Sequence, residues 1–172
     1  DLDGFKPIND NYGHDAGDKV IVQVATLLKN ECREQDIVIR WGGDEYMVVA
    51  AVENLTEAKE FAERIRKSIS TFAFDVGLSN KFNLSSSLGF ALYPFSHYAP
   101  HSITWDQVHL LADHALYISK DAGRNTWTGI VQTDKELPFS VLNSLVPNID
   151  KAIINEDVII VDRSVQKSLK TG

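Results

Sequence analysis

Helical and β-type hydrophobic patterns alternate along this chain, and this alternation constrains its fold more than any other feature. Apolar residues recur with helical spacing in three segments, which are 15–31, the residues that follow Thr56 as N-cap, and the residues from Thr104 to Gly123. β-rich runs lie between and after them, at 36–41, 46–50, 82–93 and 126–131. Short strands that alternate with helices predict an α/β layered (α+β) domain with a mixed sheet.

The composition narrows the class of protein. A chain of 172 residues with 44% hydrophobic residues can build a globular core, and no apolar run approaches the length that crosses a bilayer. The net charge of −7 argues against binding to a nucleic-acid polymer, although a few local cations can still hold one small phosphorylated ligand. The single cysteine, Cys32, excludes a disulfide framework and suits a reducing compartment. We therefore expect a cytoplasmic domain without membrane contact.

The character of the sequence changes near residue 130. Residues 1–130 hold the patterns described above, whereas 131–172 offer only the run from Val158 to Val161 as a confident strand. We predict one domain over 1–130 and a C-terminal extension of uncertain structure over 131–172. The sequence begins at Asp1 without a methionine, and we interpret the domain as trimmed at its N-terminus.

A first polar cluster lies in the opening run DLDGFKPINDNYGHDAGD. If this run opens with a strand, Asp1 and Asp3 share one face, so that a carboxylate and a nearby backbone carbonyl can bind a cation. An EF-hand loop is excluded, because Phe5 and Lys6 stand where that loop needs an Asp or Asn and a glycine. Taken alone, such a cluster is more often a turn whose Asp and Asn side chains cap local amides.

A second cluster is the hairpin tip formed by Gly42, Gly43, Asp44 and Glu45. The two glycines let a phosphate approach the backbone, and the adjacent acids repel each other unless a cation lies near. A plain solvated turn is the alternative for this segment, because Gly-Gly is a common turn pair.

A third cluster follows the last predicted helix, where Lys120 and Arg124 lie four residues apart. They can serve either the C-terminal dipole of that helix or the terminal phosphates of a nucleotide. Together the three clusters are what metal-assisted attack on a nucleotide phosphate needs. The sequence has no G-x-x-x-x-G-K-[ST] phosphate loop, which argues against a P-loop NTPase.

The motifs DLDGFKPINDNYGHDAGD, WGGDEY and KDAGRN, in this order and at these separations, resemble the GGDEF-domain diguanylate cyclases over residues 1 to about 130. The resemblance implies a nucleotidyl-cyclase fold with a ferredoxin-like core, a mostly antiparallel sheet and the GGDEY signature on a β-hairpin. It also implies a nucleotidyltransferase that condenses two GTP into the bacterial second messenger cyclic di-GMP and two pyrophosphates. Catalysis would take place in a homodimer, under an upstream sensory or regulatory domain.

The resemblance also implies roles for single residues. The ligands of Mg²⁺ or Mn²⁺ would be the Asp1 carboxylate, the Leu2 carbonyl and Asp44, and Asp44 would also help to deprotonate the 3′-hydroxyl. Lys6 would stabilise the transition state. The residues that would bind GTP are Asn9 and Asp18 at guanine and ribose, His14 in the same loop, Gly42, Gly43 and Glu45 at the hairpin, and Lys120 and Arg124 at the terminal phosphates.

Arg33 and Asp36 lie at the spacing from Gly42 at which the family has its RxxD inhibitory site. The resemblance implies that this pair holds a guanine of the product, with Arg64 as a secondary contact. Outside that context, an Arg and an Asp three residues apart are usually a surface pair of little energetic value.

Two departures from the family pattern bear on activity. Tyr46 replaces the phenylalanine of the signature and adds a hydroxyl that needs a partner if buried, and we expect activity to survive this change. The family's preceding helix and the start of its first strand are absent from this sequence, which is expected to weaken turnover. The alternative function is a catalytically silent module that acts as a receptor for cyclic di-GMP or as a GTP sensor.

Overall fold

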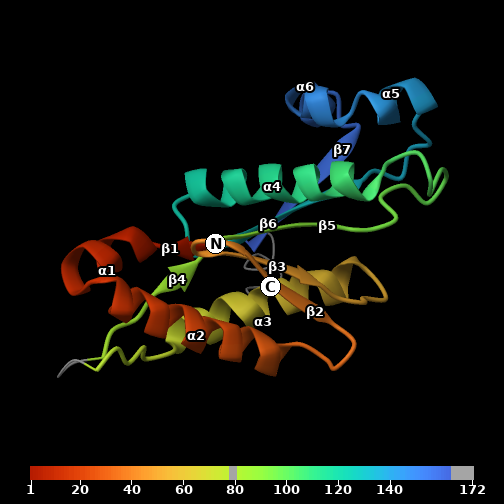
Figure 1. Cartoon of the computed structure of the whole chain (residues 1–172). Coiled ribbons are helices and arrows are strands. Elements are labelled where there is room, and N and C mark those ends of the chain that lie inside the picture. The colour runs from red at the N-terminus through yellow and green to blue at the C-terminus, as the bar shows by residue number, and fades with distance from the viewer. Residues whose placement is uncertain (78–80, 164–172) are drawn as a thin grey trace, which may run out of the picture. The chain divides into compact units, whose positions relative to one another are not determined.

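The computed structural model describes residues 1–77 and 81–163, and the chain divides into two compact units, Asp1–Ser87 and Leu88–Gly172. The first unit contains β1 (Leu2–Asp3), α1 (Phe5–Tyr12), α2 (His14–Glu31), β2 (Ile37–Gly42), β3 (Glu45–Val49), α3 (Leu55–Thr71) and β4 (Ser85–Ser86), as Figure 1 shows. The second contains β5 (Leu88–Ala91), α4 (Trp105–Asp121), β6 (Trp127–Gln132), α5 (Phe139–Asn143), a 3₁₀ helix (Val146–Asn148), α6 (Ile149–Ile154) and β7 (Val158–Asp162). This mixture of helices with antiparallel and parallel strand pairs confirms the predicted fold class.

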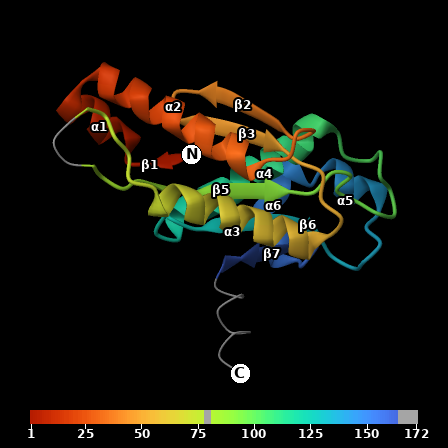
Figure 2. The same cartoon turned by 90° about the horizontal axis from the view of Figure 1, so that it is seen from below.

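The first unit is built around the apolar stripe of α2. Val20 and Val24 on this helix are fully buried, and α2 packs against α3 and β2 (Figure 2). Ile65 and Ile69 form the facing stripe of α3, as their four-residue spacing predicts. The strands pair antiparallel, β1 with β4 and β2 with β3. α2 confirms the helix predicted over 15–31 to within one residue.

The predicted start of α3 was wrong by two residues. Asn54 is the N-cap, because its side chain accepts the backbone N–H of Glu57 at 3.0 Å, and Thr56 lies inside the helix. The carboxylate of Glu57 returns to the backbone N–H of Glu53 at 2.7 Å. These two bonds satisfy amide groups near the start of the helix, and the first of them identifies Asn54 as the N-cap.

The strand predicted over 82–93 is shorter and divided. Its residues form β4 and β5, with Ser87 between them, and Phe82 makes only an isolated bridge to Phe74. The division arises because the two halves pair with different strands, β4 with β1 and β5 with β6. Alternating hydrophobicity cannot show that a run changes its partner midway.

In the second unit, α4 lies on a three-stranded sheet of order β5-β6-β7 (Figure 1). β5 and β6 are parallel, and β6 and β7 are antiparallel. Gly89 allows the close approach of β5 to α4, because a Cβ there would overlap the backbone of Ala112 and Leu116. Thr104 and Gln107 form a capping box at the start of α4, in which each side chain bonds the backbone N–H of the other residue.

The C-terminal segment is part of the second unit's core. The strand predicted at Val158 is confirmed as β7, and two short helices that sequence periodicity missed, α5 and α6, precede it. Leu142 and Leu145 are 1% exposed, and they belong to the same buried cluster as Leu111 of α4. The division into domains at residue 130 stays a prediction, but the segments on both sides of it share one core.

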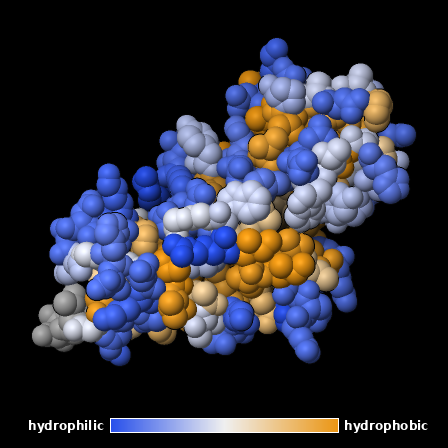
Figure 3. All heavy atoms as spheres, viewed as in Figure 1, coloured by the Kyte–Doolittle hydropathy of each residue, from blue (hydrophilic) through white to orange (hydrophobic). Residues whose placement is uncertain are grey.

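Hydrophobic side chains also reach the surface, as Figure 3 shows over the β2–β3 hairpin. Ile37, Ile39 and Trp41, which alternate along one face of β2, are among the exposed apolar residues. Within the described residues, no helix combines the length and the apolar character that crossing a membrane requires.

Candidate functional site

The predicted metal ligands of the first unit lie where β1 meets the tip of the β2–β3 hairpin. Asp1 and Ser87 exchange two backbone hydrogen bonds, of 3.1 and 3.0 Å, so they form a hydrogen-bonded pair of the β1–β4 ladder. In an antiparallel ladder the next residue turns its N–H and C=O to the opposite side. Accordingly the N–H of Leu2 donates to the Asp44 carbonyl at 3.3 Å. The Leu2 carbonyl therefore lies on the side of Asp44.

These groups fit a hard divalent cation. Two carboxylates, of Asp1 and Asp44, and one backbone carbonyl, of Leu2, are oxygen donors of the kind that Mg²⁺ and Mn²⁺ accept, and Mg²⁺ commonly completes its shell with water and substrate phosphates. Leu2 is 3% exposed, and this burial helps to hold its backbone in place. Among the described residues no three His, Cys, Asp or Glu side chains gather as a metal site.

The hairpin tip is held by a residue that sequence reasoning did not single out. Gly43 has φ of 49°, a left-handed conformation that glycine adopts without strain, and Gly42 pairs with Glu45 across the turn. Arg40 donates from Nε and from one terminal nitrogen to the Gly43 carbonyl, at 3.0 and 2.8 Å. These two hydrogen bonds hold the Gly43 carbonyl and so define the backbone position of the next residue, Asp44, which is half-buried.

Tyr46, the departure from the family signature, has a partner for its hydroxyl. The hydroxyl donates to the Ile21 carbonyl of α2 at 2.9 Å, and the side chain is half-buried. Burial raises the pKa of the Tyr46 hydroxyl, so this group stays a neutral donor. The extra oxygen ties β3 to α2.

The residues predicted to bind guanine and ribose gather at the corner between α1 and α2. Asn9 lies on α1, while His14 and Asp18 lie four apart on one face of α2, immediately after Gly13. A Cβ at Gly17 would overlap the Asn9 side chain, so α1 and α2 touch at this point. His14 and Asp18 are exposed and Asn9 is half-buried.

Lys6, the predicted transition-state residue, is exposed on the first turn of α1. Gly4 precedes that helix with φ of 77°, which lets the chain turn sharply from β1 into α1. Lys6 therefore lies within one helical turn of β1.

The two predicted phosphate cations belong to the second unit, at the end of α4. Lys120 lies in the last turn of this helix, and Arg124 follows in a turn where Gly123, Arg124 and Asn125 all have positive φ. The Arg124 N–H donates to the Ser119 carbonyl at 3.1 Å, which closes this turn on the helix. The placement of Lys120 suits the helix dipole as well as a phosphate.

Arg33 and Asp36 are in contact at the end of α2. The Asp36 carboxylate accepts the Arg33 N–H at 2.8 Å and the Ala51 N–H at 3.4 Å. The Arg33 guanidinium forms an ion pair of 2.6 Å with Glu57. The backbone N–H of Glu53, which donates to the Glu57 carboxylate, and then the Arg33 guanidinium lower the pKa of Glu57, so Glu57 is ionised at neutral pH.

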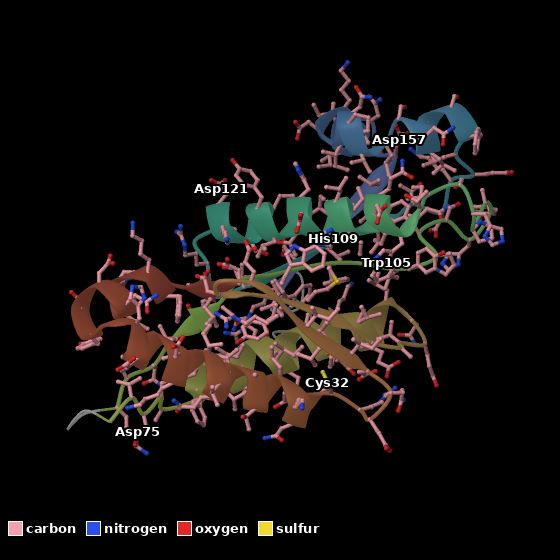
Figure 4. All side chains as sticks on the ribbon, in the orientation of Figure 1. Cys32, Asp75, Trp105, His109, Asp121 and Asp157 are labelled. Carbon is pink, nitrogen blue, oxygen red and sulfur yellow. The ribbon has the colours of Figure 1, made fainter. Side chains whose placement is uncertain are left out.

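Arg64, the third residue predicted for product binding, is also paired with an acid. Its Nε lies 3.1 Å from a carboxylate oxygen of Glu31, and the guanidinium lies over the ring of Phe61. Cys32, labelled in Figure 4 at the end of α2, is next to Glu31 in the chain. Burial raises the pKa of this thiol, with Asp36 adding to the rise and Arg64 opposing it. The structure thus gathers the three predicted residues in one region, each with partners of its own.

The sequence does not reveal Glu57 and Glu31 as partners of the two arginines, or Ser85 and Ser87 as partners of Asp3. No local signal identifies such pairs, because the partners lie between 24 and 84 residues apart.

The comparison with protein families matches this chain to the model described as "Diguanylate cyclase, GGDEF domain" over residues 1–126. That range includes β1, the β2–β3 hairpin and the end of α4, where the three motif clusters lie.

Curated proteins with these motifs are similar over the same part. The chain is 37% identical over 125 residues to the bifunctional diguanylate cyclase/cyclic di-GMP phosphodiesterase MucR of Pseudomonas aeruginosa. The matched segment covers 73% of this chain and 17% of MucR. It is 40% identical over 130 residues to diguanylate cyclase A of Treponema denticola, which covers 74% of this chain and 33% of that protein. The chain thus matches a third or less of the length of either relative.

Solved structures agree with the fold. The GGDEF domain of TpbB (YfiN) from Pseudomonas aeruginosa has a TM-score of 0.65 at 35% identity, over 73% of this chain and 70% of that one. The coiled coil and GGDEF domain of DgcB from Caulobacter crescentus, solved in complex with c-di-GMP, has a TM-score of 0.63 at 30% identity, over 73% and 63%. With the family model covering β1 through the end of α4, the chain belongs to the GGDEF-domain diguanylate cyclase family.

Proposed function

We propose that this chain is the catalytic domain of a diguanylate cyclase, which condenses two GTP into cyclic di-GMP and two pyrophosphates. The observation that carries the proposal is the hydrogen bond from the Leu2 N–H to the Asp44 carbonyl. It joins β1, which carries Asp1 and the Leu2 carbonyl, to the hairpin tip that carries Asp44, and this supports one shared set of oxygen donors. Family membership supports the same reaction.

The proposed ligands of Mg²⁺ or Mn²⁺ are the Asp1 carboxylate, the Leu2 carbonyl and Asp44. A bound divalent ion supplies Lewis acidity: it neutralises phosphate oxygens and lowers the pKa of the attacking hydroxyl. Asp44 accepts the proton of the 3′-hydroxyl, while Lys6 offsets negative charge that develops at the α-phosphate. Glu45 and the backbone of Gly42 and Gly43 complete the acidic turn that faces the phosphates.

Guanine recognition is assigned to the corner of α1 and α2. The Asn9 amide and the Asp18 carboxylate can accept the N–H groups of guanine that adenine lacks, and His14 lies one helical turn from Asp18. Lys120 and Arg124 are proposed to hold the terminal phosphates and to stabilise the departing pyrophosphate. Because each GTP donates a 3′-hydroxyl to the α-phosphate of the other, the reaction needs two such domains, and we propose a homodimer.

Product inhibition is part of the proposal. Arg33, Asp36 and Arg64 lie in one region of the first unit, and an aspartate with two arginines suits the hydrogen-bonding edges and the phosphates of cyclic di-GMP. The ion pairs of both arginines must open for a ligand to bind there. An upstream regulatory domain and a cytoplasmic location, in which Cys32 stays reduced, complete the proposed setting.

Incubation of the chain with GTP and Mg²⁺ or Mn²⁺, at protein concentrations that favour dimers, tests the activity. Cyclic di-GMP measured by chromatography and pyrophosphate measured by a coupled assay should appear in a ratio of one to two. Asp44→Ala removes a ligand and the base, so we expect kcat to fall by at least about a hundredfold. Asp134→Ala, an exposed aspartate of the second unit, is the matched control and should retain full activity.

The alternative functions give different results. A cyclic di-GMP receptor would bind that nucleotide with equal affinity in the wild type and in Asp44→Ala, and neither protein would turn over GTP. A GTP sensor would bind GTP saturably without releasing pyrophosphate. Either result in a dimeric wild-type protein would overturn the proposed activity.

A further inference from the structure

Asp3 has a position that none of the proposed catalytic roles uses. Its two carboxylate oxygens accept the hydroxyl groups of two serines, Oδ2 from Ser85 Oγ and Oδ1 from Ser87 Oγ, each at 2.7 Å. Ser87 is fully buried, and Asp3 and Ser85 are half-buried. Hydrogen bonds to an ionised carboxylate in such surroundings are about twice as strong as those between neutral groups.

The strand register places this carboxylate beside the proposed metal ligands. Asp3 lies opposite Ser85 in the β1–β4 ladder, and Asp1 lies opposite Ser87. Because side chains alternate along a strand, Asp1, Asp3 and the two serines share one face, and Leu2 points to the buried face. Ser87 lies opposite Asp1, so its hydrogen bond to Asp3 crosses the ladder diagonally.

A direct hydrogen bond from Ser85 and a diagonal one from Ser87, both accepted by the Asp3 carboxylate, fix the register of a very short strand. β1 is two residues long, and a slip by one residue would turn Asp1 toward the core and reverse the direction of the Leu2 carbonyl. Leu2 resists this slip through the burial of its side chain. Asp3 resists it through two hydrogen bonds that only one register permits. With both oxygens accepting serine hydroxyls, Asp3 is also poorly placed to bind a cation.

We propose that Asp3 is a positioning residue, which through Ser85 and Ser87 holds the Asp1 carboxylate and the Leu2 carbonyl in the orientation that binds the catalytic divalent cation. The inference rests on the proposed function, because it concerns the same metal site. It assigns to the second aspartate of the opening DLD run a role different from that of the first.

The test measures Mn²⁺ affinity rather than activity. Mn²⁺ binding to the full chain is followed by electron paramagnetic resonance, in the presence of 3′-deoxy-GTP, which lacks the attacking hydroxyl. The variants are Asp3→Asn, Ser85→Ala, Ser85→Thr and the double variant Asp3→Asn/Ser85→Ala, with Ser140→Ala as an exposed serine control. Hydrogen exchange of the Ser87 amide, which donates to the Asp1 carbonyl at 3.0 Å, reports the register directly.

We expect Asp3→Asn and Ser85→Ala each to weaken Mn²⁺ binding by about tenfold or more, as loss of a residue that orients a ligand does. The double variant should be little worse than either single one, Ser85→Thr should keep wild-type affinity because it keeps the hydroxyl, and Ser140→Ala should have no effect. Exchange of the Ser87 amide should accelerate in the weakened variants while circular dichroism and the thermal midpoint show them folded.

Two other results would overturn the inference. If Asp3→Asn weakens Mn²⁺ binding and Ser85→Ala does not, Asp3 is itself a ligand. If neither variant changes affinity or the exchange of the Ser87 amide, the serine contacts do not position the site. A wild-type chain that binds no Mn²⁺ and forms no cyclic di-GMP refutes the proposed function as well, so the two failures are distinguishable.

Discussion

At the scale of single residues, the acids beside Arg33 and Arg64 determine how easily a ligand can use these arginines. Glu57 lies 2.6 Å from Arg33, and Glu31 lies 3.1 Å from Arg64. The pKa of Glu57 is lowered by the Glu53 N–H and by Arg33, so its carboxylate is ionised at neutral pH and an anion lies beside Arg33. The proposed binding of cyclic di-GMP at this site would therefore compete with an internal anion.

Glu57→Gln should strengthen the binding of cyclic di-GMP, because it removes that competing charge and keeps an oxygen for the Glu53 N–H. An exposed ion pair is screened by solvent and contributes little, so the dissociation constant should fall only by about two- to fivefold. Isothermal titration calorimetry on wild type and variant measures the change, with Glu136→Gln as an exposed control. Weaker binding in Glu57→Gln would instead make Glu57 part of the product site.

Tyr46→Phe tests the other residue-scale feature, the hydroxyl that the family signature lacks. Its loss removes a half-buried hydrogen bond of 2.9 Å to Ile21, which should lower the free energy of unfolding by about 0.5–1.5 kcal/mol. Urea denaturation measures this value, and Tyr117→Phe, at an exposed tyrosine, should change it little. GTP turnover at temperatures well below the unfolding midpoint should be retained, because the ring stays in place. A loss of turnover at unchanged stability would show a catalytic role for the hydroxyl.

At the scale of elements, the turn after α4 combines backbone strain with a proposed function. Arg124 has φ of 65°, a region in which a residue with a Cβ costs about 1–2 kcal/mol relative to glycine. Such strain is often found where a side chain is needed in a fixed place. The strained residue here is one of the two cations proposed to hold phosphates.

Arg124→Gly should therefore raise stability and lower activity together. Relief of the positive φ is expected to raise the thermal midpoint by about 2–4 °C, for about 1 kcal/mol in a chain of this size. Loss of the guanidinium should at the same time weaken GTP turnover. Arg124→Ala is the matched variant, because it loses the charge and keeps the strain, and its midpoint should not rise. Calorimetry and pyrophosphate release measure the two effects, and a midpoint that rises equally in both variants would contradict the strain.

At the scale of the whole molecule, the C-terminal segment is part of a core and not a tail. Leu142 of α5 is 1% exposed in a cluster with Leu111 and Ala115 of α4, and β7 continues the sheet beside β6. The helix that carries Lys120 therefore depends on residues beyond the part that the family model matches, which ends at residue 126.

Leu142→Ala should destabilise this core by about 2–5 kcal/mol, the range for a buried leucine cut to alanine. Guanidinium denaturation followed by circular dichroism measures the loss, and amide exchange should place it in the second unit. Ile154→Ala, at a residue 80% exposed, should change stability by less than about 0.5 kcal/mol. A loss below 1 kcal/mol for Leu142→Ala would mean that α5 packs only loosely on α4.

Sequence alone determined the features that depend on near neighbours in the chain. The spacing of Val20 and Val24 predicted α2, the pair Gly42-Gly43 predicted the hairpin turn, and the motifs identified the family, because these signals lie within one element or one loop. The sequence did not predict α1, because its eight residues lie in a polar run that also suits a turn with capping side chains. It did not predict the short helices α5 and α6 either, because they have too few turns to show an apolar stripe.

Only the tertiary structure decided which distant groups meet. The contact of Leu2 with Asp44, the two serines on Asp3, the glutamates on Arg33 and Arg64, and the packing of Leu142 on α4 all join residues far apart in the chain. Such partners are selected by how strands and helices pack in three dimensions, and a polar or apolar residue carries no mark of which distant one it will face.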